Sequence, residues 1–390
     1  MKKTYLSAVA VLVCAALVGG IAGTSFYTKR HFKEDIVTGP NVTEVFKLSR
    51  YNPNLEGTIG DSDVYVLKGE KEGGSLVVLG STHANEPSGH MAGIILEENA
   101  KVEAGTIYVI PNINNSALTH NDPLDGSPQY MHFTTKNGET RTFQYGSRAT
   151  NPIDQWPDPD IYTHKSSGQT LSGSETRNLN RCYPGRLDGT FTERVAYAIM
   201  EFIRTEDIDL SIDCHEASIM YPVVGTYVAH QRAEDITMMA AMELTGNGIF
   251  DMKYETSPNS LKGFTHREWG DYSDTLAVLM ETPEPFIDRI VGPITEDLMM
   301  TGKDRFLSFA GDKGLTYVKY SEENDYSWPM EVRVGRHLTG AHKVMEYMGM
   351  FYPDKEIIAT WPSYEELVEK GVGAFLHDPS TANPDFVYKV

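Results

Sequence analysis

The sequence predicts an α/β fold in which one parallel or mixed sheet carries helices on its faces. Strand-like and helix-like segments alternate along most of the chain. The predicted strands are short, continuous apolar runs, as is typical of strands that are covered on both faces. A chain of 390 residues is long enough for one large core with additions at its ends. We therefore expect a single large α/β domain preceded by an N-terminal segment of a different kind.

That N-terminal segment is residues 1–30. Two lysines precede an apolar stretch over residues 5–27, and Lys29 and Arg30 follow it. The pattern is typical of a secretory signal or of an uncleaved membrane anchor, because the stretch can span a bilayer core of roughly 30 Å. Residues 21–23 (Ile-Ala-Gly) offer a passable cleavage site, so both interpretations stay open. In either case we expect an extracytoplasmic body that is secreted, periplasmic or attached to the membrane.

Composition limits the partners of this body. The chain has 54 acidic and 34 basic residues and a formal net charge of −20. Nucleic acids and anionic lipid surfaces are therefore unfavourable partners. Cys182 and Cys214 are the cysteines outside the leader. They could pair in an oxidising compartment, although we favour two separate buried thiols.

The first predicted elements form a β-α-β unit. Residues 75–80 and 106–111 are continuous apolar runs, and the apolar residues between them have helical spacing. Further along, Thr190 and Glu193 form a capping box that predicts a helix over 191–205. The later elements are a strand over 209–214, a Met-rich helix over about 233–246, a strand over 275–280 and a helix over about 286–309.

These elements place the catalytic domain over about 70–310. Within it, residues 115–176 form a long segment rich in Pro, Gly, Asn and Asp, with scattered aromatic residues. A loop of this length is usually functional or disordered, and the aromatic content argues against disorder. We expect an ordered loop over the site, with a structural surface flap as the alternative. Residues 31–69 and 311–390 are expected to be N-terminal and C-terminal extensions of unassigned role.

Three polar clusters lie at the ends of predicted strands. They are "STHANEPSG" after 75–80, "DCHEA" at 213–217 and "ETPEP" at 281–285. In open α/β sheets, ligands bind outside the carboxyl ends of the strands. The shared position predicts that the three clusters converge on one crevice.

The residue types in these clusters match a zinc site. Catalytic zinc is bound by three protein ligands, and His83, Glu86 and His215 form a two-His-one-Glu set. Glu281 would then take a proton from the metal-bound water and pass it to the leaving group. Each motif alone has an ordinary alternative, because the His83-Glu86 pair could be a solvated turn and Glu216 a surface carboxylate.

A fourth cluster, "ETRNLNRCYPGR", covers residues 175–186. An arginine presents a planar fork to a carboxylate, and a neighbouring amide can bind the same oxygen. Asn180 and Arg181 would therefore clamp a substrate carboxylate. The alternative is that Arg177 and Arg181 pair with Glu175 and other acidic neighbours on a loop.

In this order, the motifs resemble the zinc-dependent succinylglutamate desuccinylase and aspartoacylase family, a branch of the carboxypeptidase A-like metallohydrolases. The resemblance extends over roughly 70–290. It is carried by His83-x-x-Glu86, by Asn178-Leu179-Asn180-Arg181 running into Tyr183-Pro184-Gly185, by Asp213-x-His215 and by a strand that ends in Glu281.

The resemblance implies a zinc carboxypeptidase-like fold, with a mixed, mostly parallel eight-stranded sheet between helices. It implies one Zn²⁺ per chain on the two histidines and Glu86, with Glu281 as general acid/base. Asn180 and Arg181 would bind a substrate carboxylate. A further arginine polarises the scissile carbonyl in the family, and here we choose Arg148 over Arg177.

The sequence also departs from the family pattern. Asn178 stands where the family usually has Asp, and Arg267 is a loose candidate for a second substrate-binding arginine. The 115–176 segment and the leader are not typical of the cytoplasmic metabolic members. The resemblance therefore does not assign succinylglutamate or N-acetylaspartate as the substrate.

The function we expect is zinc-dependent hydrolysis of an amide bond in an N-acyl amino acid or a similar small carboxylate-bearing substrate. One alternative is an extracytoplasmic zinc carboxypeptidase that acts on peptides or cell-wall peptides. An alternative of another class is an envelope binding protein that uses the Arg181 pocket and keeps a non-catalytic metal site. The sequence contains no G-x-S-x-G, P-loop or H-E-x-x-H motif that would indicate another enzyme class.

Overall fold

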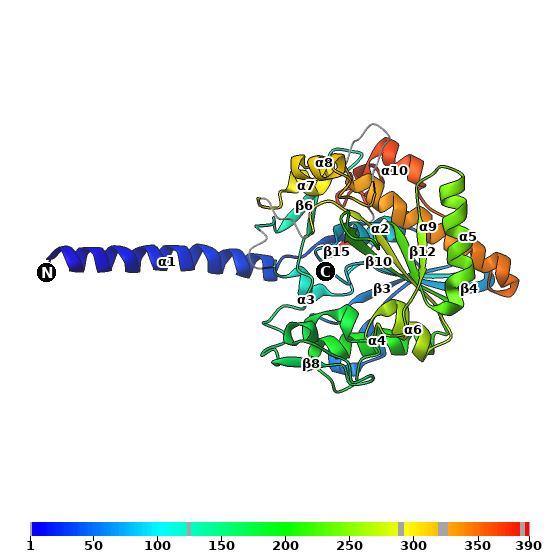
Figure 1. Cartoon of the computed structure of the whole chain (residues 1–390), viewed down its shortest axis with the longest axis horizontal. Helices are drawn as coiled ribbons and strands as arrows, with labels where there is room; N and C mark the ends of the chain where they lie inside the picture. The colour runs from blue at the N-terminus through cyan, green and yellow to red at the C-terminus, as the bar shows by residue number, and fades with distance from the viewer. Residues whose placement is uncertain (1, 123–125, 288–291, 319–326, 383–386, 390) are drawn as a thin grey trace.

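A central sheet with helices on both faces forms the body of the protein (Figure 1). The computed structural model describes residues 2–122, 126–287, 292–318, 327–382 and 387–389. Eight strands of the sheet follow the order β12-β11-β13-β10-β4-β5-β3-β2, and a ninth, β14, pairs with β5 beside this path. The bounds are β2 Glu44–Lys47, β3 Asp63–Lys68, β4 Lys71–Leu79, β5 Lys101–Ile110, β10 Leu210–Ser218, β11 Thr226–Ala229, β12 Lys253–Thr256, β13 Leu276–Glu284 and β14 Ile358–Thr360.

The predicted fold class is confirmed, and its parallel part is the centre of the sheet. Strands β13, β10, β4 and β5 run parallel to one another. Antiparallel pairing joins β11 to β13 on one side and β3 and β2 on the other. The carboxyl ends of β4, β10 and β13 therefore meet at one edge of the sheet, as the positions of the polar clusters predicted.

Alternation along the central strands produces two cores. In β4, Leu76 and Val78 pack into one core and Val77 and Leu79 into the other, because successive side chains of a strand point to opposite faces. The first core contains the helices α2 (Pro87–Asn99), α5 (Glu234–Gly246) and α9 (Met330–Phe351). The second contains α4 (Phe191–Thr205), with Trp269 of α6 (Thr265–Tyr272). The central strands have continuous apolar runs in the sequence because helices cover both of their faces.

Most of the predicted elements are present. The capping box of Thr190 and Glu193 begins α4. Strands β10 and β13 extend four residues beyond their predicted ends, to Ser218 and Glu284, so His215 and Glu281 lie inside strands rather than after them.

The single helix predicted over about 286–309 is wrong. Two short helices occupy the described part of this region, α7 (Glu296–Thr301) and α8 (Arg305–Asp312), and residues 288–291 lie outside the described residues. Gly302 adopts a left-handed conformation (φ 63°) that ends α7. The Asp304 side chain then accepts a hydrogen bond from Leu307 N and begins α8.

The 115–176 segment is ordered where it is described. It contains the short helix α3 (Asn115–Leu118) and two hairpins, and residues 123–125 lie outside the described residues. The hairpins pair β6 (Tyr130–Thr134) with β7 (Thr140–Gln144) and β8 (Ile161–Thr163) with β9 (Thr170–Ser172). Two 3-10 turns, η3 (Gly173–Arg177) and η4 (Leu179–Arg181), follow the second hairpin.

Residues outside 70–310 also contribute to the sheet and its cores. Strands β2 and β3 come from the predicted N-terminal extension, and β14 and α9 from the predicted C-terminal extension. The remaining elements are β1 (Asp35–Val37) paired with β15 (Val387–Lys389), the helix α10 (Tyr364–Lys370), and the 3-10 turns η1 (Leu48–Arg50), η2 (Pro53–Leu55), η5 (Gln231–Ala233), η6 (Pro353–Lys355) and η7 (Val372–Phe375). The expected boundaries at 70 and 310 therefore do not limit the packed structure.

Helix α1 (Lys2–Arg30) projects from the body as a single rod (Figure 1). Over Tyr5–Arg30 it is long and apolar enough to cross a membrane, and a signal sequence has the same length and composition. In the body, Cys182 and Cys214 are both buried and unbridged, as we favoured from the sequence.

Candidate metal centre

Three potential metal ligands meet where β4 and β10 end. His83 and Glu86 lie on the turn between β4 and α2, and His215 lies in β10, the parallel neighbour of β4. All three side chains are buried, and one ligand atom from each lies within 4.8 Å of the others. The predicted His-Glu-His set is therefore brought together in space.

Both histidines face Glu86 through the same ring nitrogen, Nδ1. Nδ1 of His83 lies 2.6 Å from Glu86 Oε1, and Nδ1 of His215 lies 2.8 Å from Glu86 Oε2. Two imidazole nitrogens and one carboxylate form the donor set of a catalytic zinc site with a fourth position left for water. The residues present thus fit a zinc ion at the point where these atoms converge.

Burial and charge act on these groups in opposite directions. Burial lowers the pKa of His83 to about 4. Burial also disfavours a charged His215, but the carboxylates of Asp213 and Glu86 outweigh it and raise the pKa of His215 above its usual value. The two histidines in turn hold the pKa of Glu86 well below its usual range in spite of burial. The centre therefore keeps its carboxylate ionised and ready to bind a cation.

The far nitrogen of each histidine is also held. Nε2 of His215 lies 2.7 Å from Asp213 Oδ2, and Nε2 of His83 lies 2.9 Å from Asn178 Oδ1. Asp213 is fixed in turn by the hydroxyls of Thr82 and Thr265. Partners of this kind orient metal-binding histidines and tune their basicity. Sequence reasoning assigned no such role to Asp213, although residues two apart on a strand share a face.

Glu281 lies beside the metal centre. It is the register partner of His215 in the parallel pair β10 and β13, so the two side chains point to the same face. Its Oε2 is shielded from solvent and has no hydrogen-bond partner among the described residues. Burial, opposed by the charge of His215 and aided by that of Glu86, raises the pKa of Glu281 to about 7. A carboxyl group with this pKa can both accept and release a proton near neutral pH.

Two arginines, Arg181 and Arg148, lie close enough to the centre to act on its charges. The guanidinium of Arg181 stacks on the ring of Phe264, with Cζ 3.7 Å from the ring centroid, and its Nε lies 3.6 Å from Glu175 Oε2. Burial and the charge of Arg148 lower the pKa of Arg181 to about 10. Arg148 also acts on the charges of His83 and Glu281. The site therefore combines three potential metal ligands, the carboxyl group of Glu281 and two neighbouring positive charges.

The Asn180 side chain has a structural contact within this site. Its Oδ1 accepts a hydrogen bond of 2.9 Å from the backbone N–H of Thr265, at the start of α6. The Arg181 guanidinium donates to the Asn180 carbonyl oxygen at 2.8 Å. Asn180 thus holds α6 and Arg181 close to the centre.

Two predicted arginines are occupied elsewhere. Arg177 pairs with Asp158 through Nε (2.7 Å) and Nη2 (3.0 Å). Arg267 is buried and binds Asp271 through Nε (3.0 Å) and Nη2 (2.5 Å). For Arg177 this favours the alternative of a loop ion pair, with Asp158 rather than Glu175 as the acid. Neither contact offers a guanidinium to a substrate.

Glu216 is a buried carboxylate whose backbone supports Glu86. The backbone N–H of Glu216 donates to Glu86 Oε2 at 2.9 Å, and its side chain accepts from Ser88 N and from Arg333 Nη1 at 2.8 and 2.7 Å. Both side chains of the ion pair between Glu216 and Arg333 are fully shielded from solvent. The interpretation of Glu216 as a surface carboxylate is therefore wrong, because helix α9 covers it.

Comparison with known proteins finds neither a matching family model nor a matching curated protein. Among solved structures, a succinylglutamate desuccinylase/aspartoacylase from Rhodobacter sphaeroides is 14% identical with a TM-score of 0.41, and the match covers 82% of this chain and 67% of that one. A metallo-carboxypeptidase from Burkholderia cenocepacia is 10% identical with a TM-score of 0.45, covering 84% and 69%. The ectoine utilization protein EutE (DoeB) from Ruegeria pomeroyi is 21% identical with a TM-score of 0.34, covering 57% and 53%.

These descriptions name the family that the sequence resembles. This chain spans about half the length of the ectoine utilization protein. Likenesses at these identities and TM-scores do not establish an activity, which has to follow from the residues of the site.

Proposed function

We propose that this chain is a zinc-dependent hydrolase that cleaves the amide bond of an N-acyl amino acid or a similar small substrate with a free carboxylate. One observation carries the proposal. Glu281, whose Oε2 has no hydrogen-bond partner in the described part of the chain, lies in register with His215, beside a buried two-His-one-Glu donor set. A metal-binding set without such a carboxyl group would suit a structural site equally well.

Each side chain has a defined task in the proposed reaction. His83, Glu86 and His215 would hold the zinc, which supplies a water of lowered pKa and polarises a carbonyl group. Glu281 accepts the proton of the attacking water and later delivers it to the leaving amine. Arg148 donates to the carbonyl oxygen as negative charge develops on it.

Substrate selection falls to Arg181 in this proposal. Stacking on Phe264 holds its guanidinium in one orientation. A carboxylate bound there would place one amide bond next to Glu281 and leave longer or uncharged substrates poorly aligned. We further propose that the body works outside the cytoplasm, with α1 as its signal or anchor, since that helix is long and apolar enough to cross a membrane.

The first experiment tests the metal. Purified chain should contain one zinc per molecule, and His83→Ala should lose the zinc together with activity on a panel of acyl-amino acids and short peptides. Zinc-free wild-type chain that is as active as zinc-loaded chain would contradict the proposal. The same panel separates a deacylase from a carboxypeptidase, because only the second requires a peptide substrate.

The second experiment tests Glu281. We expect Glu281→Gln to keep its zinc and to lose about 10²- to 10⁴-fold in kcat, the usual contribution of acid–base catalysis. Glu56→Gln, the same change at an exposed position, is the matched control and should be fully active. Equal activity of the Glu281→Gln and wild-type chains would contradict the mechanism, and ligand binding without turnover by both would favour an envelope binding protein.

A further inference from the structure

The base of helix α1 is built into the body rather than merely attached to it. Lys29 is fully buried, and its Nζ donates to the side-chain oxygen of Asn121 and to the backbone oxygen of Tyr145. Arg30 forms a two-pronged ion pair with Asp154, with both N–O distances at 2.6 Å. A buried lysine is costly unless it is bonded, so these contacts specify one position for this end of the helix.

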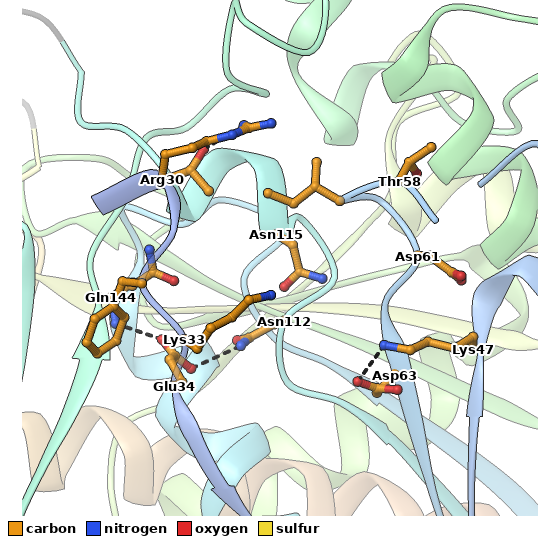
Figure 2. Close-up of a pocket in the computed structure, with 13 residues that line it drawn as sticks. Arg30, Lys33, Glu34, Lys47, Thr58, Asp61, Asp63, Asn112, Asn115 and Gln144 are labelled. Atoms are coloured by element: carbon orange, nitrogen blue, oxygen red, sulfur yellow. Dashed lines mark hydrogen bonds and ion pairs between the residues drawn. The ribbon is translucent and has the colours of Figure 1, made fainter. Parts of the chain in front are cut away.

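Glu34 supplies a second connection to the same part of the body (Figure 2). Its Oε1 accepts from the backbone N–H of Gln144 at 2.7 Å, and its Oε2 accepts from Asn112 at 3.1 Å. The Gln144 side chain donates back to the Lys29 carbonyl oxygen at 3.1 Å. Glu34 and Gln144 also line a cavity of about 300 Å³ beside this junction. Lys29 and Glu34 thus both bind the adjacent residues Gln144 and Tyr145.

Beyond Tyr145, the chain runs alongside the turn that carries His83. Gly146 N donates to the Ala84 carbonyl at 2.8 Å, and Ala84 N donates to the Ser147 carbonyl at 3.0 Å. Ala84 follows the ligand His83 in sequence. Arg148 follows Ser147 in sequence, and its backbone N–H donates to the side chain of Asp122 at 3.1 Å. Segment 144–148 is therefore bonded at its start to the base of α1 and in its middle to the turn that carries His83.

We infer that Lys29 and Glu34 are positioning residues for Arg148, so that the base of the apolar helix is a working part of the catalytic site. The inference rests on the proposed function. Catalytic groups must be held within about 0.5 Å of their productive geometry, and a misplacement of about 1 Å can cost about 10²-fold in rate. Segment 144–148 is bonded at its start to Lys29 and Glu34 and further along to Ala117 and Asp122, so the first anchor is one of the contacts that fix its position. A cut after residue 23 would leave Lys29 and Glu34 in place.

The test uses the full-length chain in detergent. Lys29→Met removes the charge and both donated bonds, and Lys33→Met is the matched control at an exposed position four residues later. We expect Lys29→Met to lower kcat about 10- to 100-fold, with KM and zinc content close to wild type, because Arg181 and the metal ligands are not altered. Lys33→Met should behave as wild type in every measurement.

A double-mutant cycle separates positioning from general loss of stability. In an Arg148→Ala chain, which has already lost the positioned group, Lys29→Met should cause little further loss of kcat. An equal fold-loss in both backgrounds, or an unchanged kcat in the single variant, would overturn the inference. Should Lys29→Met fail to fold, Gln144→Met removes another bond of the same junction, from the Gln144 side chain to the Lys29 carbonyl oxygen, and carries the same expectations.

Hydrogen exchange tests the coupling without any activity. Lys29→Met should speed exchange at the amides of Ala84, Gly146 and Ser147 and leave exchange in α5 unchanged. Unchanged exchange at these three amides would overturn the inference even in an active enzyme. Faster exchange in a chain that hydrolyses nothing on the panel would instead leave the coupling intact and count against the proposed function.

Discussion

The two histidines of the proposed metal centre are supported by different chemistry at their far nitrogens. His215 meets the carboxylate of Asp213, whereas His83 meets the neutral amide of Asn178. A carboxylate raises the basicity of an imidazole as well as orienting it, and an amide only orients it. We therefore expect His215 to be the stronger of the two nitrogen ligands.

Replacement of Asp213 tests this difference. Asp213→Asn should lower zinc affinity about 10- to 100-fold, because the amide lacks the charge that favours metal binding by His215. Competition with a chelator of known affinity measures the change. Asp188→Asn, on an exposed loop, makes the same chemical change as a control. An affinity that stays at the wild-type value would count against the proposed role of Asp213.

The ionisation of Glu281 predicts a pH dependence. Its pKa is raised to about 7, and the carboxylate form is the one that accepts a proton from water. Zinc adds positive charge nearby and favours the carboxylate, which lowers this pKa in the loaded enzyme. We therefore expect kcat/KM to fall with decreasing pH through a midpoint below 7, and this acid limb to be absent from the residual activity of Glu281→Gln. A rate that rises as the pH falls would contradict the assignment.

At the scale of secondary-structure elements, the site depends on how closely α2 approaches β10. A Cβ atom at Gly89 would lie 2.5 Å from the Cys214 carbonyl oxygen. Because Glu86 immediately precedes α2 and His215 follows Cys214, this contact sets the distance between two of the ligands. The absence of a side chain at Gly89 is therefore a requirement of the metal centre.

Gly89→Ala should push α2 away from β10. We expect a loss of about 1–3 kcal/mol in unfolding free energy, the usual cost of overpacking, together with weaker zinc binding. Thermal melting and chelator competition measure the two effects. Gly246→Ala, at the end of α5 where nothing lies within 4 Å of the added atom, should leave zinc affinity unchanged. Wild-type zinc binding by Gly89→Ala would contradict the argument.

The elements differ in how far the sequence predicts them. Strands β4, β5, β10 and β13 were predictable because burial on both faces requires continuous apolar runs. The hairpins within 115–176 were not, since their short strands pair with each other and, among the described residues, not with the central sheet. The break at Gly302 was missed because the apolar spacing continues across it. Propensity and periodicity do not report a left-handed residue in such a case.

The candidate site shows the same division. His83, Glu86, His215 and Glu281 were found because short motifs at strand ends carry them. The contact between Glu216 and Arg333 joins residues 117 positions apart, and no local pattern encodes it. Arg267 was selected by its residue type, although its ion pair with Asp271 has the i,i+4 spacing of neighbours on one helix, which the sequence could have indicated.

At the scale of the whole molecule, the junction between α1 and the body decides where a soluble fragment should begin. A chain that starts at residue 24 keeps Lys29, Arg30 and Glu34, whereas one that starts at residue 35 loses all three. We expect the shorter fragment to be less stable by about 1–3 kcal/mol, because it removes the carboxylate that binds the buried backbone N–H of Gln144. Urea unfolding of the two fragments measures the difference, and equal stabilities would contradict this view.

The position of Arg333 links the metal centre to the order in which the chain is made. The ribosome adds helix α9 after every candidate ligand, so a chain that stops before Met330 contains His83, Glu86 and His215 but no counter-charge for Glu216. Without α9, Glu216 loses its ion pair with Arg333, and the uncovered face of α2 exposes apolar surface to chaperones and proteases. Interrupted translation should thus yield no metal-binding by-product, which comparison of cellular half-lives for chains ending at residues 329 and 390 can test. Chaperones and proteases would recognise such a fragment by the apolar surface that α9 covers in the complete chain.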